Sequence, residues 1–526
     1  MKIEHRNGNA VKTLHAVIVP FPAQGHITPC LQLAKKLVRL GFHITFINTI
    51  HNHDRMMKSC SKDREPDEDI EFVAVSDGLP DDHPRLADLG SFCSSFSEMG
   101  PVFAELFEKL LRKSPITCVI HDVAAVAVHE PVKKLGILVV GIVTPSAISL
   151  QCYWNIETFI DAGILPLPPP PTYILTPSLD PVKLTLGLPR SDQETAIRDA
   201  PLTCLPGVSP TMRVNDIPTF LQTHDLNSYF IRFFRFTQNP LLPDCECLLF
   251  NTFHDLEGEI LDAMTDINSN IYFVGPLVFN STENQVDEVE ELSLAATASA
   301  LWKEDPLSLS WLDNQKQNSV LFVSFGSIAT MSIEQMQELA LGLEMSGHAF
   351  LWVIRSDLIE DTHENKEFQI MLSDIMQRTQ DRALLVPWVE QIAVLSHPSV
   401  AAFLTHCGWN STIESISTGV PMLCWPRFAE QNTNCHYIKC VWEIGLDFKS
   451  QVKDDTTIVS KEEVAKKVRK IMAIDGADLE IDKIRTNARN LRIAARKAVS
   501  GGGSSHTAFM KFVQQIEKTS KLQLPS

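Results

Sequence analysis

The residues best suited to chemistry lie in one segment, residues 388–431. Within it, the run HCGWNST at residues 406–412 stands where an apolar stretch gives way to a helical pattern. A helix N-terminus offers free backbone N–H groups and a positive partial charge, which suit a diphosphate. Gly408 allows a ligand to approach the backbone, and the Ser411 hydroxyl can donate a further hydrogen bond. This run therefore predicts a phosphate-binding turn.

The neighbours of this turn each allow a structural and a functional interpretation. Glu414 could accept hydrogen bonds from ribose hydroxyls, yet Ser411 and Glu414 also have the spacing of a helix capping box. Trp388 could be a stacking platform for a base or a core aromatic residue. Residues 430–431, Glu-Gln, could bind a polar ligand or begin a solvated helix. None of these residues alone decides the function.

Two residues far from this segment could form a proton-transfer pair. His26 stands in the turn after the apolar run 15–20, and Asp122 directly follows the run 117–121. If both runs are strands of one parallel sheet, the two side chains can meet at its edge. Each residue also has an ordinary interpretation, since His26 could be a surface or capping histidine and Asp122 a helix N-cap.

Short apolar runs that alternate with helical patterns predict a buried parallel sheet in the first half of the chain. The runs are residues 15–20, 43–48, 71–76, 117–121 and 137–143. A helix should follow the first run, with Thr28 as its N-cap, Pro29 at its first position and Gly41 ending it.

The same alternation restarts in the second half. The strand-like runs are residues 320–325, 350–354, 383–389, 400–405 and 422–425, and helical spacing appears at residues 333–345 and 412–417. Ser332 and Gln335 match a capping box for the first of these helices.

This organisation predicts an α/β protein of two doubly wound domains with a ligand cleft between their strand ends. We place the first domain at residues 1–279, an acidic linker at 280–303 and the second domain at 304–500. The C-terminal segment 501–526 should form a helix that packs back on the first domain. Its amphipathic pattern is clearest at residues 507–516, after the glycines at 501–503.

Composition limits the classes of partner and compartment. The 526 residues are too many for one ordinary hydrophobic core, and a net charge of −18 argues against a nucleic-acid or anionic-membrane surface. The 12 cysteines include no C-x₂-C pair, and the Cys-Glu-Cys at 245–247 has the wrong spacing for a structural zinc site. Residues 1–14 lack the apolar run of a signal peptide, and the apolar window 135–150 is too short to span a bilayer. We therefore expect a cytoplasmic monomer without an integral membrane segment.

Residues 388–431 resemble, over their whole length and without a gap, the plant secondary-product glycosyltransferase box. The resemblance extends to PFPAQGH at 20–26, VGPL at 274–277, SFGS at 324–327 and LWVIR at 351–355, and so covers most of the chain. It identifies the chain as similar to the plant UDP-dependent glycosyltransferases. That family has the GT-B fold, in which two Rossmann-like domains face each other across a cleft.

The resemblance also implies a role for each matched residue of the donor site. Trp388 would stack on uracil, Gln391 and Glu414 would hold the ribose, and Glu430 with Gln431 would bind the sugar hydroxyls. The family's glucose users typically have glutamine at the position of Gln431. The residues that the resemblance assigns to the UDP-sugar are Ser327, Trp388, Val389, Gln391, His406, Trp409, Asn410, Ser411, Glu414, Glu430, Gln431 and Thr144. Of these, Ser327, His406, Asn410 and Ser411 would hold the diphosphate, and Trp409 and Thr144 would face the sugar.

For catalysis, the resemblance implies that His26 is the general base and that Asp122 orients it. The acceptor would attack the anomeric carbon from the face opposite UDP, which inverts the configuration, and neither a metal nor a cofactor is required. We expect UDP-glucose as donor and a small lipophilic acceptor such as a flavonoid, another phenolic compound or a terpenoid. The family's usual proline is replaced by Glu390, and its usual glycine-containing pair by Ala-Ala at 401–402, which bears on donor affinity.

Three other classes of protein would share parts of this pattern. A dinucleotide-dependent dehydrogenase needs a G-x-G-x-x-G after the first strand, and an α/β-hydrolase needs a G-x-S-x-G elbow; neither motif is present. A non-catalytic sugar-nucleotide-binding protein would satisfy the box equally well. The presence of both His26 and Asp122 favours an enzyme over such a protein.

Overall fold

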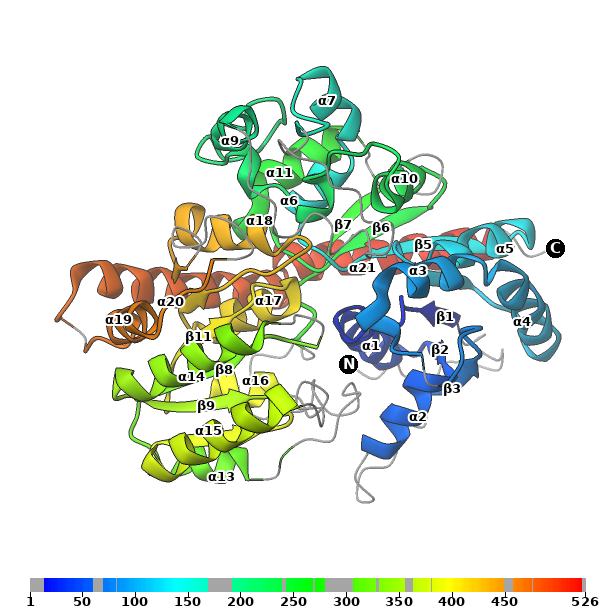
Figure 1. Ribbon diagram of the computed structural model, residues 1–526. Helices are drawn as coiled ribbons and strands as arrows, with labels where there is room; N and C mark the ends of the chain where they lie inside the picture. Colours follow the sequence, from blue (N-terminus) through cyan, green and yellow to red (C-terminus); the bar gives the residue numbers. More distant parts are fainter. Residues whose placement is uncertain are drawn as a thin grey trace.

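The computed structural model describes residues 14–59, 70–81, 83–168, 192–238, 243–267, 270–279, 305, 307–327, 331–354, 363–379, 381–448, 457–474 and 476–522. Two parallel sheets, each flanked by helices, organise these residues (Figure 1). This arrangement confirms the predicted GT-B class of two Rossmann-like domains. The predicted linker at 280–303 lies outside the described residues.

The first sheet has seven strands in the order β3-β2-β1-β4-β5-β6-β7, all of them parallel. The elements of this half, in chain order, are β1 (His15–Val19), α1 (Gln24–Arg39), β2 (His43–Thr49), α2 (Ile50–Ser59), β3 (Ile70–Val75), η1 (Arg85–Asp88), α3 (Leu89–Ser97), α4 (Gly100–Lys113), β4 (Cys118–Asp122), η2 (Val126–Val128), α5 (His129–Lys134), β5 (Leu138–Val143), α6 (Ala147–Tyr153), α7 (Ile156–Asp161), α9 (Asp192–Asp199), η3 (Val214–Asp216), η4 (Thr219–Leu221), α10 (Tyr229–Phe236), β6 (Cys247–Phe250), α11 (His254–Ile267) and β7 (Ile271–Phe273).

The second sheet has six strands in the order β10-β9-β8-β11-β12-β13, again all parallel. The elements of this half are α13 (Ser308–Asp313), β8 (Val320–Ser324), α14 (Ile333–Ser346), β9 (Ala349–Val353), α15 (His363–Thr379), β10 (Ala383–Val386), α16 (Gln391–Ser396), β11 (Val400–Thr405), α17 (Trp409–Thr418), β12 (Met422–Cys424), α18 (Gln431–His436), η7 (Tyr437–Val441), β13 (Gly445–Asp447), α19 (Lys461–Ile471), α20 (Leu479–Val499) and α21 (Ser504–Leu522).

The strands β8 and β11 of the second sheet are continuously apolar and fully buried, as are β1 and β5 of the first. This is the composition of parallel strands covered on both faces. Short strands at 247–250, 271–273 and 445–447 were not predicted, because runs of three or four residues carry too little periodicity to be recognised.

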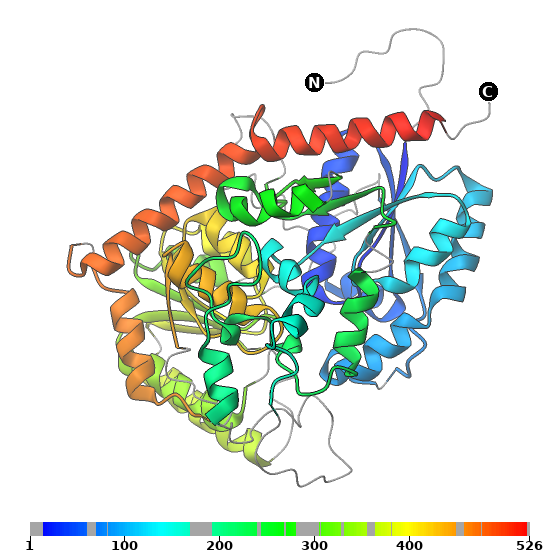
Figure 2. The ribbon, with the colours of Figure 1, turned by 90° about the horizontal axis from the view of Figure 1, so that it is seen from above.

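The last two helices connect the two halves of the molecule. Figure 2 shows α20 and α21 following one another along one side of the molecule. α20 packs on α17 and α11, while α21 packs on β7 of the first sheet. Phe509, Phe512, Val513 and Ile516 form the apolar face of α21 and join the core beneath that sheet. Within the described part of the chain, no helix combines the length and apolarity needed to cross a bilayer.

The predicted start of the first helix, with Thr28 as N-cap and Pro29 at the first position, is wrong. α1 begins at Gln24, so that Pro29 lies inside the helix. Because proline has no N–H, it cannot donate to the Gly25 carbonyl four residues earlier. The side chain of Asn410, from the second half, donates to that carbonyl instead, with N and O 2.6 Å apart. A contact between the two halves thus replaces the helical hydrogen bond.

The capping box predicted at Ser332 and Gln335 is half correct. The Ser332 hydroxyl accepts a hydrogen bond from the Gln335 N–H at 3.2 Å, as expected of an N-cap. The Gln335 side chain does not reach back to Ser332, because it pairs twice with the backbone of Val459, at 3.0 and 2.8 Å. A tertiary contact therefore replaces the second half of the local motif.

The packing of α21 gives a first prediction. Phe512 is 1% exposed against the first sheet and lies near the Tyr272 ring. Phe512→Ala should lower the free energy of unfolding of the first domain by about 3–5 kcal/mol, the usual cost of emptying a buried phenylalanine site. Urea unfolding followed by circular dichroism measures this loss. Ile493→Ala on α20, where the side chain is 66% exposed, is the control; an equal effect of both changes would contradict the packing of α21.

Candidate active site

A cavity of about 350 Å³ lies between the carboxyl ends of the two sheets. Parallel strands deliver the residues that follow them to the same edge, and both halves contribute to its lining. Residues from the first half include His26, Asp122 and Thr144, and those from the second half include Ser327, Trp388, Val389, Gln391, His406, Trp409, Asn410, Ser411, Glu414, Glu430 and Gln431. All the predicted site residues therefore line one cavity.

Three side chains of the first half meet at the cavity wall. His26 Nδ1 lies 2.6 Å from Asp122 Oδ2 and 2.9 Å from the Thr144 hydroxyl. His26 stands in the first turn of α1, Asp122 ends β4 and Thr144 follows β5. Because β1, β4 and β5 are neighbours in the sheet, their ends bring the three residues together.

The environment of His26 raises the pKa of its imidazole. Its burial lowers its pKa, but the charge and hydrogen bond of Asp122, with a smaller effect of Glu430, outweigh burial, so that the pKa of His26 is raised. Asp122 is fully buried, whereas 29% of the His26 side chain is exposed. The Asp122 carboxylate also accepts the Ala124 N–H at 2.8 Å, which fixes its orientation. The ring is thus held on its Nδ1 side.

The second half presents a helix N-terminus to the cavity. α17 begins at Trp409 with Gly408 as N-cap, which has no side chain to cap the helix. The Glu430 carboxylate accepts a hydrogen bond from the Trp409 backbone at this end of the helix. His406 lies between two glycines: a Cβ on Gly326 would be 2.6 Å from its Cε1, and a Cβ on Gly408 would be 2.5 Å from its Nε2. Both positions therefore require glycine for the imidazole to occupy this place. Ser327 lies next to Gly326, in the turn that follows β8.

Gln391, Ser411 and Glu414 form a connected polar group. The Gln391 amide nitrogen donates to Ser411 Oγ at 2.9 Å and to Glu414 Oε2 at 2.7 Å. The structural interpretation of Ser411 and Glu414 as a capping box is wrong, because the helix begins two residues before Ser411 and is capped by Gly408. Burial raises the pKa of Glu414 to about 7, against a smaller opposing effect of the Gln391 hydrogen bond.

Gln431 and Glu430 follow the loop after β12. Gln431 Oε1 accepts the backbone N–H groups of Arg427 and Phe428, at 2.8 and 3.1 Å. Gln431 therefore also holds the loop that precedes it. Burial raises the pKa of Glu430, while its backbone hydrogen bonds and the charge of His26 act in the opposite direction.

Trp388 and Val389 form the wall beyond β10, which ends at Val386 and is shorter than the predicted strand. Trp388 is partly buried, and its carbonyl accepts the Asp305 N–H at 2.9 Å. Trp388 therefore has one side in the core and one side toward the cavity.

Hydrogen bonds within the second half and across to the first half hold the turn at residues 406–409, before and at the start of α17. Trp409 Nε1 donates to the Asn251 carbonyl at 2.9 Å, so its N–H is engaged within the protein. Asn434 Nδ2 donates to the Cys407 carbonyl at 2.9 Å, and Asn434 Oδ1 accepts the Ser146 hydroxyl at 2.8 Å. Cys407 has a φ of 67°, unusual for a residue other than glycine. Asn434 supports this backbone from the side.

An aromatic wall completes the first-half side of the cavity and was not predicted. Its members are Phe21, Tyr153, Phe220, Tyr229, Phe230, Phe233 and Phe234, with Phe428 from the second half. Tyr153 stacks on Phe234 with ring centres 3.8 Å apart, and Phe220 stacks on Phe230 at 4.0 Å. The signal in the sequence is YFIRFFRF at 229–236, which forms α10.

Two groups of buried side chains elsewhere have the composition of metal ligands. They are His121, His129 and Cys245 in the first half and Cys407, Cys424 and Cys435 in the second. None of the six lines the cavity.

The raised pKa of Glu414 predicts a dependence of stability on pH. The folded protein holds the Glu414 proton up to about pH 7, whereas the group has an ordinary value of 4.5. Stability should therefore fall as the pH rises from 4.5 to 7, because the charged form is disfavoured in the folded state. Glu414→Gln should remove this loss, so that the variant gains roughly 2–3 kcal/mol relative to the parent between about pH 4.5 and about pH 7.

Thermal unfolding at both pH values measures this gain. Glu98→Gln, at an exposed position, is the matched control and should follow the parent at both pH values. A constant difference between Glu414→Gln and the parent would show that Glu414 titrates alike in the folded and unfolded chains.

Comparison with known proteins places this site in a family. Residues 299–475 match the family model described as UDP-glucoronosyl and UDP-glucosyl transferase. A 7-deoxyloganetin glucosyltransferase of Catharanthus roseus is 37% identical over 96% of this chain and 97% of its own. Linamarin synthase 1 of Manihot esculenta is 35% identical over the same shares.

Among solved structures, Os79 from O. sativa in complex with UDP superposes with a TM-score of 0.73 and 26% identity, covering 95% of this chain and all of its own. The full-length likeness to curated relatives, together with the matched fold, confirms the family that the sequence resembles. The chain belongs to the plant UDP-glycosyltransferase family and is a glycosyltransferase.

Proposed function

We propose that this chain is an inverting glucosyltransferase, which transfers glucose from UDP-glucose to a hydroxyl group of a small lipophilic acceptor. The observation that carries the proposal is the 2.6 Å contact between His26 Nδ1 and Asp122 Oδ2 at the cavity wall. A histidine oriented by a carboxylate is an arrangement suited to removing a proton from a hydroxyl group. A non-catalytic sugar-nucleotide-binding protein would have no use for this pair.

In the proposed reaction, His26 Nδ1 donates to Asp122, so Nε2 accepts the proton of the acceptor hydroxyl. The acceptor oxygen bonds to the anomeric carbon from the face opposite UDP. The bond from that carbon to the phosphate oxygen breaks, and its electron pair leaves with UDP. An α-linked donor thereby gives a β-linked product. Thr144, 3.4 Å from Asp122 Oδ2, donates to the same carboxylate and supports its charge.

The donor would bind along the second half. The N-terminus of α17 would face the diphosphate and stabilise the charge that develops on it, so the proposal includes no metal and no cofactor. Ser327, His406, Asn410 and Ser411 would add contacts to the same group. Trp388 would stack on the uracil.

The ribose and glucose would extend from either side of the diphosphate. Gln391 and Glu414, already joined by a 2.7 Å hydrogen bond, would bind the ribose hydroxyls, and Val389 would pack beside them. Glu430, Gln431 and Trp409 would face the glucose. The names of the relatives support this donor, since glucosyltransferase appears in one and a complex with UDP in another.

The acceptor class follows from the aromatic wall. Stacked rings favour a lipophilic acceptor with a flat or compact apolar surface, such as a terpenoid alcohol, a phenol or a flavonoid. Relatives are named for 7-deoxyloganetin and linamarin, and one solved neighbour holds pterostilbene. Release of UDP from UDP-glucose with a panel of such acceptors tests the proposal. Binding of UDP without turnover on the whole panel would favour the non-catalytic alternative.

The general-base role predicts a specific pattern of losses. His26→Ala should reduce turnover of an aliphatic alcohol by about 10²–10⁴-fold and leave the dissociation constant of UDP unchanged, because His26 would contact the acceptor. Asp122→Asn should lose a large part of the same factor, since it removes the charge that supports the protonated ring. An acidic phenol, already partly ionised, should lose less. Initial rates and UDP titration calorimetry provide both values.

His254→Ala, a half-exposed histidine on α11, is the control for this series. In the parent, the raised pKa of His26 should place the acid limb of kcat/KM above the ordinary 6.5. Full activity of His26→Ala on aliphatic alcohols would exclude the mechanism.

Gln431 provides a test of donor selection. Gln431→Ala should lower kcat/KM for UDP-glucose about tenfold or more while weakening UDP binding less, because a sugar hydroxyl loses its partner in a closed site. Gln431 also holds the Arg427–Phe428 backbone through Oε1, so Gln431→Glu is the matched variant that keeps an acceptor there and loses the donor. Both variants should lose efficiency. Normal use of UDP-glucose by Gln431→Glu would assign donor selection elsewhere in the site.

A further inference from the structure

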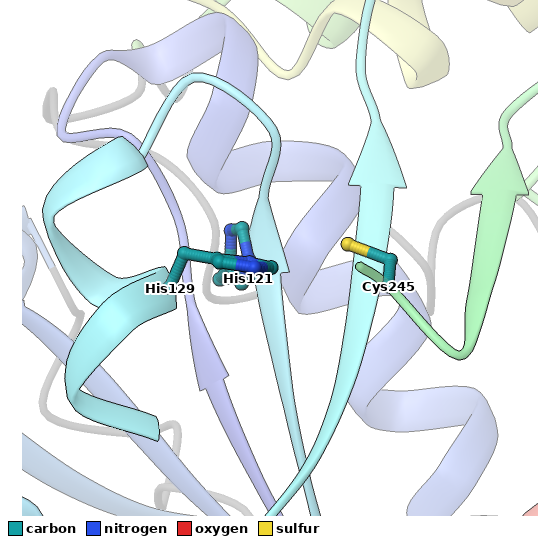
Figure 3. Close-up of side chains that lie close together, drawn as sticks. All are labelled: His121, His129 and Cys245. Carbon is teal, nitrogen blue, oxygen red and sulfur yellow. The ribbon is translucent and has the colours of Figure 1, made fainter. Parts of the chain in front are cut away.

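Three buried side chains with metal-binding atoms meet in the first half, outside the cavity lining (Figure 3). His121 comes from β4, His129 begins α5, and Cys245 stands two residues before β6. Their ligand atoms all lie within 4.8 Å of one another. None of the three residues is more than 5% exposed. Histidine side chains are seldom fully buried unless their nitrogen atoms have partners, so two buried imidazoles beside a thiol call for an explanation.

The hydrogen bond of His121 defines its tautomer. His121 Nδ1 lies 2.7 Å from the Asp122 carbonyl oxygen, which can only accept, so Nδ1 carries the proton. In the neutral ring this leaves the lone pair on Nε2. That Nε2 lies 3.2 Å from His129 Nδ1. Two imidazole nitrogens bound to one tetrahedral zinc ion lie about 3.3 Å apart, given zinc–nitrogen bonds of about 2.0–2.1 Å.

If the two rings hydrogen-bond only to each other, one nitrogen of His129 is left without a hydrogen-bond partner. To donate to His121 Nε2, neutral His129 must carry its proton on Nδ1. Its Nε2 would then be a buried lone pair, and this atom has no hydrogen-bond partner. The neighbouring Asp244 Oδ2, 4.0 Å away, is itself an acceptor.

A cation shared by His121 Nε2 and His129 Nδ1 would give a partner to the lone pairs of both nitrogens, which lie 3.2 Å apart. His129 then keeps its proton on Nε2, which faces Asp244, while His121 keeps its proton on Nδ1, which faces the Asp122 carbonyl. Histidines that bind metals usually donate their second N–H to a carboxylate or a backbone carbonyl. The Asp122 carbonyl is within hydrogen-bond distance of His121 Nδ1, and the Asp244 carboxylate lies 4.0 Å from His129 Nε2.

A glycine lies beside the third ligand. β5 runs between β4 and β6, and Gly141 on β5 stands opposite His121 in the register. A Cβ at Gly141 would lie 3.4 Å from Cys245 Sγ and 2.7 Å from Leu248 Cδ2. The closest approach is thus to Leu248, and Cys245 Sγ packs at contact distance from the place that a side chain at position 141 would occupy.

We propose that His121, His129 and Cys245 form a structural site for a zinc-type divalent ion. Two imidazole nitrogens and one thiolate suit a borderline-soft ion of this kind. On binding, the Cys245 thiol loses its proton to solvent as the S–metal bond forms, and nothing is oxidised or reduced. Asp244 lies beside His129, is one-third exposed to solvent and forms an ion pair with Lys133.

The ion would stabilise the element that carries Asp122. It would join the end of β4 to the start of α5 and to the segment before β6, beside the carbonyl of Asp122 itself. Its role would be structural, since the three ligands do not line the cavity, and the proposal is independent of the sugar-transfer chemistry.

Cobalt and zinc titrations of the full-length, chelator-treated protein test the site. Co²⁺ should bind with one equivalent that shows a thiolate-to-cobalt charge-transfer band, and Zn²⁺ should displace it. Cys245→Ser should abolish the band and weaken Co²⁺ binding about tenfold or more, and His129→Gln should weaken binding to a similar extent. Zn²⁺ should raise the thermal midpoint of the parent and not of these variants.

The second buried group, which contains Cys435, supplies the matched control. Cys435→Ser removes a buried thiol of the other half and should keep the band, the stoichiometry and the thermal shift. Far-ultraviolet circular dichroism shows which variants are folded. A parent that binds no Co²⁺, a band that persists in Cys245→Ser and His129→Gln, or a band lost only in Cys435→Ser would each overturn the proposal.

Discussion

The arrangement of the whole cavity depends on one constraint, the parallel direction of every described strand in both sheets. Parallel strands end at a common edge, so His26, which follows β1, becomes a neighbour of Asp122 and Thr144 although it is 96 and 118 positions from them in the chain. Reversing one strand of five residues would move its last side chain about 16 Å to the opposite edge. The contact of His26 with Asp122 exists because both strands run the same way.

Electrostatics at the cavity are unusual for a site that faces a diphosphate. The described residues that line it include Asp122, Glu390, Glu414 and Glu430, and neither a lysine nor an arginine. Among the described residues, the N-terminus of α17 and His26, whose pKa is raised, are then the main sources of positive potential. The raised pKa values of Glu414 and Glu430 fit this setting, because burial without a cation disfavours the charged carboxylate.

The same few contacts that shape the site also join the two halves. Asn410 replaces the hydrogen bond that Pro29 cannot give to Gly25, and Trp409 donates to Asn251. These residues sit in the first turn of α17, next to the groups that would hold the donor. Movement of one half relative to the other would therefore disturb the donor-side turn directly.

Much of this organisation was visible in the sequence, and the reason is that local patterns encode local structure. Continuous apolar runs predicted ten of the strands, and the segment 388–431 with its outlying motifs indicated the family and the site residues. The errors came where distant contacts overrode local rules. Pro29 is tolerated inside a helix because Asn410 donates to the Gly25 carbonyl. The Gln335 side chain bonds to the Val459 backbone and not to Ser332.

Only the tertiary structure decided which side chains meet. Thr144 joins His26 and Asp122, and two histidines and a cysteine that looked unrelated in the sequence lie close together. Such groupings depend on strand order and register, which no local pattern specifies. The sequence by itself determined the fold class and the identity of the candidate site residues, because periodicity and motifs are local. Packing alone decided their geometry, because it depends on residues far apart in the chain.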